Sequence, residues 1–164
     1  MKKTRYDLIC RLIDSFDWGC KYVNDYNALL HDYSGVVLYQ AESQFIHQIG
    51  ANPGITITEL AAFFDKTKSA CSQLMRRMKD KGWLDQIRNE ENNREFNLYL
   101  TEDGQKIYEF HKEFEEGCYR RTAQMLDQFS EEELNGYIGI QNKLNEAFRM
   151  DVEESRAIWA NAVK

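Results

Sequence analysis

The stretch that decides the fold runs from residue 55 to residue 104 and reads ITITELAAFFDKTKSACSQLMRRMKDKGWLDQIRNEENNREFNLYLTEDG. Thr56 is followed three residues later by Glu59, a spacing that predicts a capping box at the start of a helix. The apolar pattern breaks at Asp65-Lys66-Thr67, and Thr67 is suited to cap a second helix. Two helices joined by a tight connection are therefore expected. The buried side of the first is expected to comprise Leu60, Ala61, Phe63 and Phe64.

The second helix has two contrasting faces. Its apolar stripe, at helical spacing, consists of Cys71, Leu74, Met75 and Met78. The other face carries hydroxyls, an amide and long cations, which are the groups that bind base edges and phosphates. Gln73 is best suited to read adenine, and Arg76 to contact phosphate. The residues predicted to contact DNA are Thr67, Lys68, Ser69, Ser72, Gln73, Arg76, Arg77 and Lys79, together with Arg88 and Arg94.

A hairpin is predicted directly after this helix. Gly82 stands where a helix end favours a left-handed residue, and Trp83 returns the chain to the core. Residues 96–100 alternate between apolar and polar, which predicts a strand with one buried face, and residues 84–88 are its expected partner. The tip, residues 89–93, is rich in turn-forming Asn. A helix-turn-helix followed by such a wing is a device for reading double-stranded DNA.

The charge distribution supports this interpretation. The chain has 164 residues and a net charge of −6, which by itself argues against nucleic acid. Residues 66–94, however, contain eight cations and four acids, so this segment carries +4 and the remainder carries −10. A basic patch on an acidic body can bind phosphate while limiting non-specific association.

Long helices are expected on both sides of this region. They are predicted over about residues 4–30 and 40–49, from Thr101-Glu102-Asp103-Gly104 to about residue 128, and from a capping box at Ser130 and Glu133 to Val152 or further. The apolar residues that need a partner surface are Ile107, Phe110, Phe114, Tyr137, Ile140, Leu144 and Phe148. A second subunit would cover them, because one recognition helix reads only a half-site. The predicted fold is therefore mainly α (α+β), a winged helix-turn-helix at residues 37–102 with dimerisation helices at residues 1–36 and 103–164.

Other classes of protein find little support. The N-terminus does not resemble a signal peptide, and no apolar run is long enough for a membrane span, so a cytoplasmic protein without membrane association is expected. No catalytic constellation or phosphate loop is present, so no enzyme activity and no cofactor are predicted. The histidines (His31, His47, His111) are isolated in sequence, and no metal site is predicted. A reduced, buried structural role is expected for each of Cys10, Cys20, Cys71 and Cys118.

With these elements in this order, the chain resembles the MarR family of bacterial transcriptional regulators. The resemblance covers nearly the whole chain and is sharpest at ITITELAAFF, at MKDKGWL and at LTEDG. It implies a homodimer that binds a pseudo-palindromic operator, represses nearby genes and releases DNA when it meets a small, often aromatic ligand. The alternative is a winged-helix module that binds another protein, but an apolar outer face on the second helix, which that alternative requires, is missing.

The chain departs from the family pattern in two places. In the family the wing carries Asp-x-Arg, and here Arg94 occupies the Arg position while Asn92 replaces the Asp, which predicts a weaker wing contact. One branch of the family senses peroxides through a cysteine in the first helix, near tyrosines that Tyr26 and Tyr39 resemble. Cys10 lies two residues before the position of that cysteine, and two residues turn a helix by about 200°. No peroxide role is therefore expected.

The resemblance also implies an effector crevice beside the long first helix. Aromatic side chains on or near the first two helices could line it, and such a pocket would suit a phenol or a small aromatic acid. The same side chains could instead be ordinary core. The residues predicted to bind the effector are Trp18, Tyr22, Tyr26, Tyr39 and Phe45.

Overall fold

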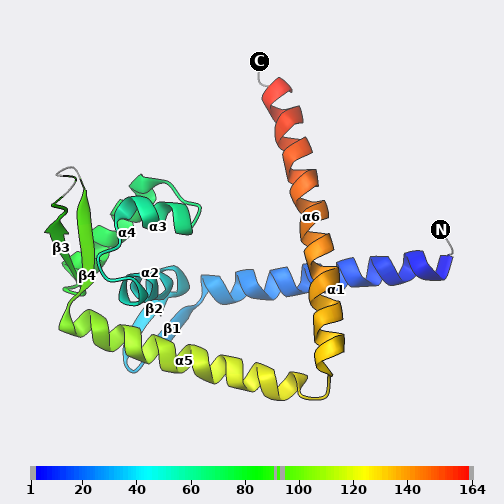
Figure 1. Cartoon of the computed structure of the whole chain (residues 1–164), viewed down its shortest axis with the longest axis horizontal. Coiled ribbons are helices and arrows are strands. Elements are labelled where there is room, and N and C mark those ends of the chain that lie inside the picture. The colour runs from blue at the N-terminus through cyan, green and yellow to red at the C-terminus, as the bar shows by residue number, and fades with distance from the viewer. Residues whose placement is uncertain (1–2, 91, 93–94, 163–164) are drawn as a thin grey trace. The chain divides into compact units, whose positions relative to one another are not determined.

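A computed structural model describes residues 3–90, 92 and 95–162 of the chain. The chain forms two compact units, one up to Gly117 and one from Cys118 onward, and helix α5 runs through the boundary. Figure 1 shows the elements in order. They are α1 (Lys3–Ala28), β1 (Leu30–Tyr33), β2 (Val36–Tyr39), α2 (Gln40–Ala51), α3 (Ile57–Phe63), α4 (Lys68–Asp80), β3 (Leu84–Arg88), β4 (Phe96–Leu100), α5 (Glu102–Leu126) and α6 (Glu131–Ala162).

Helices α3 and α4 begin at the predicted capping residues. The backbone N–H of Glu59 donates to the Thr56 hydroxyl at 3.2 Å, and the Glu59 carboxylate accepts from the backbone N–H of Thr56 at 2.8 Å. The Thr67 hydroxyl accepts from the backbone N–H of Ala70 at 3.2 Å. Each cap binds a backbone donor that the first turn of the helix leaves without a partner. The helix-turn-helix is therefore confirmed.

The wing is an antiparallel pair formed by β3 and β4, in register from Leu84↔Leu100 to Arg88↔Phe96. Gly82 has φ +77°, the left-handed conformation expected where α4 ends. The chain before α3 joins the hairpin, because the backbone N–H of Leu98 donates to the carbonyl of Ile55 at 3.0 Å. The predicted fold class, a mainly helical winged helix-turn-helix, is confirmed.

The core lies where α2, α3, α4 and the wing meet. The fully buried side chains from these elements include Phe45, Ile46, Ile49, Leu60, Met78, Leu84 and Leu98. One prediction is wrong, because Phe63 is 61% exposed. Helix α3 has only seven residues, and Leu60, Ala61 and the half-buried Phe64 fill its inner side. The turn of the helix directs Phe63 outward.

The start of α5 packs closely against the residues that follow α4. The Thr101 hydroxyl donates to the carbonyl of Gly82 at 2.7 Å and accepts from the backbone N–H of Gly104 at 3.1 Å. A Cβ atom at Gly104 would collide with the carbonyl oxygen of Trp83. Glycine at this position is therefore required by close approach of two backbones, which explains the end of the LTEDG motif.

A second hairpin, β1–β2, was not predicted. It pairs from Leu30↔Tyr39 to Tyr33↔Val36 around a two-residue turn. Ser34 and Gly35 both have positive φ, 56° and 92°, which is the turn geometry that matches the twist of a tight hairpin. Helix α1 consequently ends at Ala28, before the predicted Leu30.

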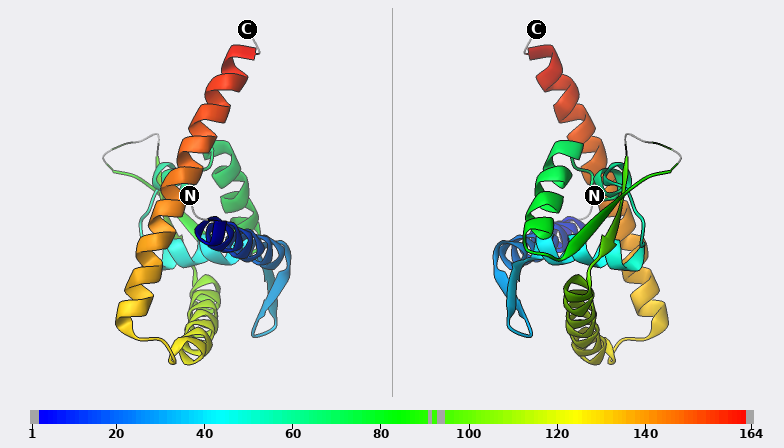
Figure 2. Two further views of the ribbon diagram at one scale, coloured as in Figure 1. Left: turned by 90° about the vertical axis from the view of Figure 1, so that its right-hand side faces the viewer. Right: turned by 90° about the vertical axis from the view of Figure 1, so that its left-hand side faces the viewer.

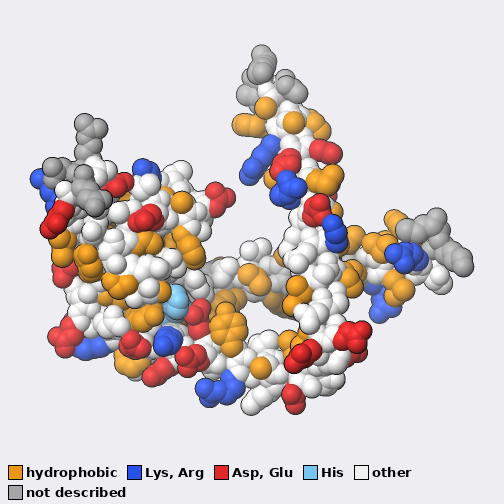
Figure 3. Space-filling model, viewed as in Figure 1, with side chains coloured by type: hydrophobic (Ala, Val, Ile, Leu, Met, Phe, Trp, Pro, Cys, Tyr) orange, Lys and Arg blue, Asp and Glu red, His pale blue; other side chains and the backbone are white. Residues whose placement is uncertain are grey.

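The second unit contains the end of α5 and the whole of α6. Helix α6 begins at the predicted capping box, in which the Glu133 carboxylate accepts from the Ser130 backbone N–H at 2.9 Å and the Glu133 N–H donates to the Ser130 hydroxyl at 3.2 Å. None of the side chains described between residues 118 and 162 is buried within this chain. Figure 3 shows apolar side chains along α6. Those at least 45% exposed include Tyr137, Ile138, Ile140, Met150, Ile158 and Trp159.

The length and composition of the helices bear on whether any of them could span a membrane. Over the residues that the structure describes, none of them combines the length and the apolar content needed to cross a bilayer.

Candidate nucleic-acid interface

Helix α4 presents one face to the core and the other to solvent. Cys71 and Met78 are 2% and 0% exposed, and Leu74 and Met75 on the same side are partly buried. The predicted apolar stripe is thus the packing face. Figure 2 shows α4 beside the β3–β4 hairpin, and α4 contacts β3.

The predicted DNA-contacting residues lie mostly on the outer face. Ser72 is half-buried, and Arg94 lies outside the described residues. Arg88 is the last residue of β3 and is exposed. The exposed residues at the start of α4 and along it are Thr67, Lys68, Ser69, Gln73, Arg76, Arg77 and Lys79.

The long cations of α4 are not neutralised by neighbouring acids. Within the described part of the chain, no carboxylate lies at ion-pair distance from Lys68, Arg76 or Arg77. Lys79 donates to the side-chain oxygen of Gln86 in β3 at 3.1 Å. Such cations remain available to an external anion.

Lys81, which contributes to the basic segment in sequence, is engaged within the fold. Its ammonium lies 3.4 Å from the carboxylate of the buried Glu42 in α2 and 4.6 Å from the centre of the Trp83 ring. These contacts join the end of α4 to α2. Lys81 therefore has a structural role and does not belong to the outer face of α4.

The hairpin and α4 enclose a groove of about 380 Å³. The Thr58 hydroxyl donates to the Glu95 carboxylate at 2.8 Å, which fixes the wing to the start of α3. The backbone N–H of Asn92 donates to the Asn89 side chain at 2.8 Å within the turn. The side chains that line the groove are Ile57, Thr58, Lys68, Ser72, Met75, Gln86, Asn92, Glu95 and Phe96.

A cavity of about 400 Å³ lies between α2 and the first part of α4, and only one predicted effector residue, Phe45, lines it. Trp18 and Tyr22 are exposed on α1 with their rings 5.9 Å apart, and Tyr26 lies 4.2 Å from the His31 ring. Tyr39 is 50% exposed at the start of α2. The lining residues are Asn27, Gln40, Ala41, Gln44, Phe45, Phe64, Lys66, Ala70, Cys71 and Leu74. Of the predicted effector residues this cavity therefore brings in Phe45 alone, and an effector site formed by the five predicted residues stays a prediction.

The cysteine predictions are partly wrong. Cys71 is buried against the core, and burial raises the pKa of its thiol, as expected for an unreactive structural residue. Cys20 is exposed on α1, while Cys10 and Cys118 are half-buried. Exposure on a long helix could not be judged from helical spacing, because the spacing does not say which partner covers each face.

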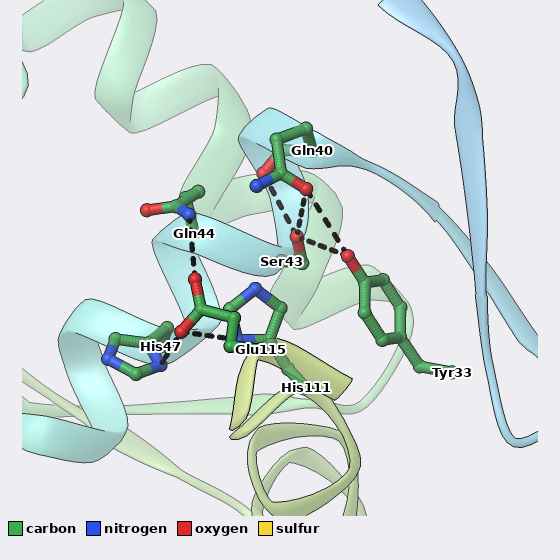
Figure 4. A network of polar contacts seen from close by, with 7 residues as sticks. All are labelled: Tyr33, Gln40, Ser43, Gln44, His47, His111 and Glu115. Carbon is green, nitrogen blue, oxygen red and sulfur yellow. Dashed lines mark hydrogen bonds and ion pairs between the residues drawn. The ribbon is translucent and has the colours of Figure 1, made fainter. Parts of the chain in front are cut away.

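Sequence reasoning also missed a polar cluster between α2 and α5. His47, His111 and Glu115 place their ligand atoms within 4.8 Å of one another, and Figure 4 shows the three side chains converging. Burial lowers the pKa of His111, which is 1% exposed, so its ring is neutral near pH 7. The one local signal was the spacing of His111 and Glu115, which places both on one side of α5. His47 approaches only through the tertiary fold.

Comparison with known proteins agrees with this architecture. Residues 39–95 match the model of the MarR family. Over this segment the chain is similar to the MarR family of winged helix-turn-helix transcriptional regulators, and its fold resembles that of solved members of the family.

Three relatives show how far the similarity extends. An uncharacterised HTH-type transcriptional regulator of Bacillus subtilis (strain 168), YhjH, is 26% identical over 97 residues, which is 59% of this chain and 55% of that protein. The chain thus matches about half the length of this curated relative. The crystal structure of MarR is 29% identical with a TM-score of 0.50, covering 71% of this chain and 78% of that one. FabT of Streptococcus pneumoniae, solved in complex with DNA, is 21% identical with a TM-score of 0.63, covering 90% and 99%.

Proposed function

We propose that this chain is a cytoplasmic transcriptional repressor that binds a pseudo-palindromic operator in double-stranded DNA as a homodimer and acts without catalysis. A small aromatic ligand is proposed to release it. The observation that carries DNA binding is the outer face of α4, which holds cations without acidic partners among the described residues, directly opposite a buried apolar stripe. FabT, a relative of the same fold, was solved with DNA.

The roles of the side chains follow from their chemistry. Lys68, Arg76 and Arg77 are proposed to bind phosphates, which supplies affinity for any sequence. Gln73, also exposed on α4, is proposed to read one adenine through its amide. The wing is proposed to contribute less to DNA binding, because Asn92, which stands where the family has Asp, cannot form an ion pair with Arg94.

The proposal is tested by fluorescence anisotropy with a genomic operator fragment selected by the full-length protein. Arg76→Gln should weaken binding to operator and random DNA alike and lower the slope of log K against log salt by about one. Lys112→Gln is the matched control, since Lys112 is an exposed cation on α5, away from α4. Equal effects of the two substitutions would contradict a phosphate contact by Arg76.

Gln73→Ala tests sequence reading separately. It should weaken operator binding by an amount equivalent to about 1–3 kcal/mol and relax the preference at one base pair. A uniform loss over all sequences would remove Gln73 from the base-reading role.

A homodimer is supported by the apolar side chains of α6, which this chain alone leaves exposed. Half-sites in the operator should then lie about 10 base pairs apart, centre to centre. Sedimentation velocity at micromolar concentration tests the assembly, and a monomer that still binds the operator tightly would contradict it.

The cavity beside Phe45 supports a small aromatic effector. Its apolar wall includes Phe64 and Leu74, and Lys66 at its edge could pair with a carboxylate. Salicylate-like acids are expected to weaken operator binding by an amount equivalent to about 1–3 kcal/mol. Lys66→Met should abolish this response to acids but preserve operator binding. No response of the unmodified protein at millimolar ligand would contradict the effector.

A further inference from the structure

The cluster of His47, His111 and Glu115 lies in the first unit and has no role in the proposed DNA binding. His47 comes from α2, and the other two lie one turn apart on α5. The Nδ1 atoms of both histidines lie 3.7 Å from the same oxygen, Oε2 of Glu115. Figure 4 shows the two rings on either side of that carboxylate.

These distances do not suit direct hydrogen bonds. An N–H···O bond spans about 2.7–3.2 Å, so neither ring bonds the carboxylate at 3.7 Å. Within the described residues, neither ring nitrogen of His111 has a hydrogen-bond partner, and neither does the buried Nδ1 of His47. Buried polar atoms without partners are rare in folded proteins and call for an explanation.

The same distances suit three ligands around one ion. With bonds of about 2.0–2.1 Å, two ligand atoms on a tetrahedral zinc ion lie about 3.4 Å apart. The observed 3.7 Å corresponds to an angle of about 130° between two such bonds, and the three ligand atoms, which lie within 4.8 Å of one another, would move closer together by a few tenths of an ångström when an ion binds. We propose that His47, His111 and Glu115 form a binding site for a divalent transition-metal ion, an inference that goes beyond the proposed DNA binding.

The donor set defines the class of metal. Two imidazoles and one carboxylate suit Zn²⁺ and its neighbours in the first transition row, whereas Mg²⁺ and Ca²⁺ prefer oxygen ligands throughout. Three protein ligands leave a further position for water or an exogenous ligand.

Neighbouring side chains contact all three ligands. The amide of Gln44 donates to Oε1 of Glu115 at 3.3 Å, which leaves Oε2 directed at the two histidines. The Tyr33 ring lies 5.3 Å from the His111 ring, and the Tyr108 ring lies 5.4 Å from that of His47. A hydrogen bond to a ligating carboxylate and an aromatic wall are both typical of metal sites in proteins.

The site would add a metal-mediated link between α2 and α5, which already contact each other through Gln44 with Glu115 and through His47 with Tyr108. Helix α2 contributes Phe45, Ile46 and Ile49 to the core, and α5 leads out of the first unit. Metal binding to the folded state should therefore raise the melting temperature of the protein.

The test uses the full-length protein freed of metal with a chelator. Titration with Co²⁺, followed by visible absorption, should show one ion per chain with the spectrum of nitrogen and oxygen ligands and no thiolate charge-transfer band. Competition with a chromophoric chelator gives the Zn²⁺ affinity. His47→Gln and Glu115→Gln should each weaken it at least about tenfold, because even outer-shell changes cost 10–100-fold. Both residues are half-buried, so both variants are expected to fold, and circular dichroism checks this.

His31→Gln is the matched control, since this histidine is buried, lies outside the cluster and bonds to the carbonyl of Tyr26 at 3.0 Å. It should leave the metal affinity unchanged. The proposal is overturned if no ion binds with the expected spectrum, if a thiolate band appears, or if His31→Gln weakens binding as much as the cluster variants. Because no DNA is used, these results are independent of operator binding.

Discussion

The region from His31 to His111 buries many of its apolar side chains, whereas the last helix, α6, leaves most of its apolar side chains exposed. In the first, α2, α3, α4 and the wing surround Phe45, Leu60 and Leu98, none of which is more than 1% exposed. In α6, no described side chain is buried, and Trp159 is 70% exposed. The first region can therefore be stabilised by its own hydrophobic core, whereas the last helix needs another surface.

The largest expected effect tests this difference directly. Leu60→Ala removes a fully buried side chain from α3 and should lower the free energy of unfolding by about 2–5 kcal/mol, because it leaves a cavity. Ile158→Ala, at a position on α6 that this chain alone leaves 71% exposed, should change it by less than about 0.5 kcal/mol at protein concentrations low enough to keep the chain monomeric. Denaturant unfolding of both variants at one protein concentration gives the two values. Equal losses would break the comparison, since Ile158 would then be covered as deeply as Leu60.

The second prediction sharpens the comparison within one helix. Gly104 and Gly117 both lie in α5, but a Cβ at Gly104 would meet the carbonyl of Trp83, whereas at Gly117 no neighbour lies within 4 Å. Gly104→Ala should therefore destabilise the protein by about 1–3 kcal/mol through overpacking. Gly117→Ala should stabilise it by up to about 1 kcal/mol, because alanine favours a helix. Thermal melts that rank the two variants in the opposite order would mean that the start of α5 is not closely packed.

What could be predicted from the sequence was local. Thr56 with Glu59, Thr67 and Gly82 marked the ends of α3 and α4, because caps and left-handed glycines depend on neighbours in sequence. The alternation of residues 96–100 indicated the wing for the same reason. These elements, in order, were enough to predict the winged helix-turn-helix.

What was missed depends on distant contacts or on a weak local pattern. The β1–β2 hairpin had a signal in Ser34-Gly35 between two short apolar runs, but four-residue strands are easily read as the end of a long helix. The cluster of His47, His111 and Glu115 had only the weak signal of the four-residue spacing between His111 and Glu115, since α2 and α5 meet only in the tertiary fold. The apolar spacing along α1 also could not predict that Trp18 and Cys20 are exposed, because the spacing does not identify the surface against which the helix packs.

The smallest effect compares one motif in the two regions. Thr56 with Glu59 and Ser130 with Glu133 form the same capping box, but Thr56 is buried and Ser130 is exposed. Thr56→Ala should cost about 1 kcal/mol at neutral pH, because it removes the hydroxyl that caps α3. Ser130→Ala should cost less, because water can replace the hydroxyl at an exposed helix start.

The pH dependence of the stability lost in Thr56→Ala provides a further check. Hydrogen bonds from the backbone and the hydroxyl of Thr56 lower the pKa of Glu59. A carboxyl whose pKa is lower in the folded state stabilises the protein above its unfolded pKa, about 4.3, and loses this contribution as the pH falls through its folded value. The difference between the unmodified protein and Thr56→Ala should therefore shrink in acid. Urea unfolding at a series of pH values measures it, and a difference that stays constant from neutral pH into acid would show that the Glu59 carboxylate does not strengthen the cap of α3.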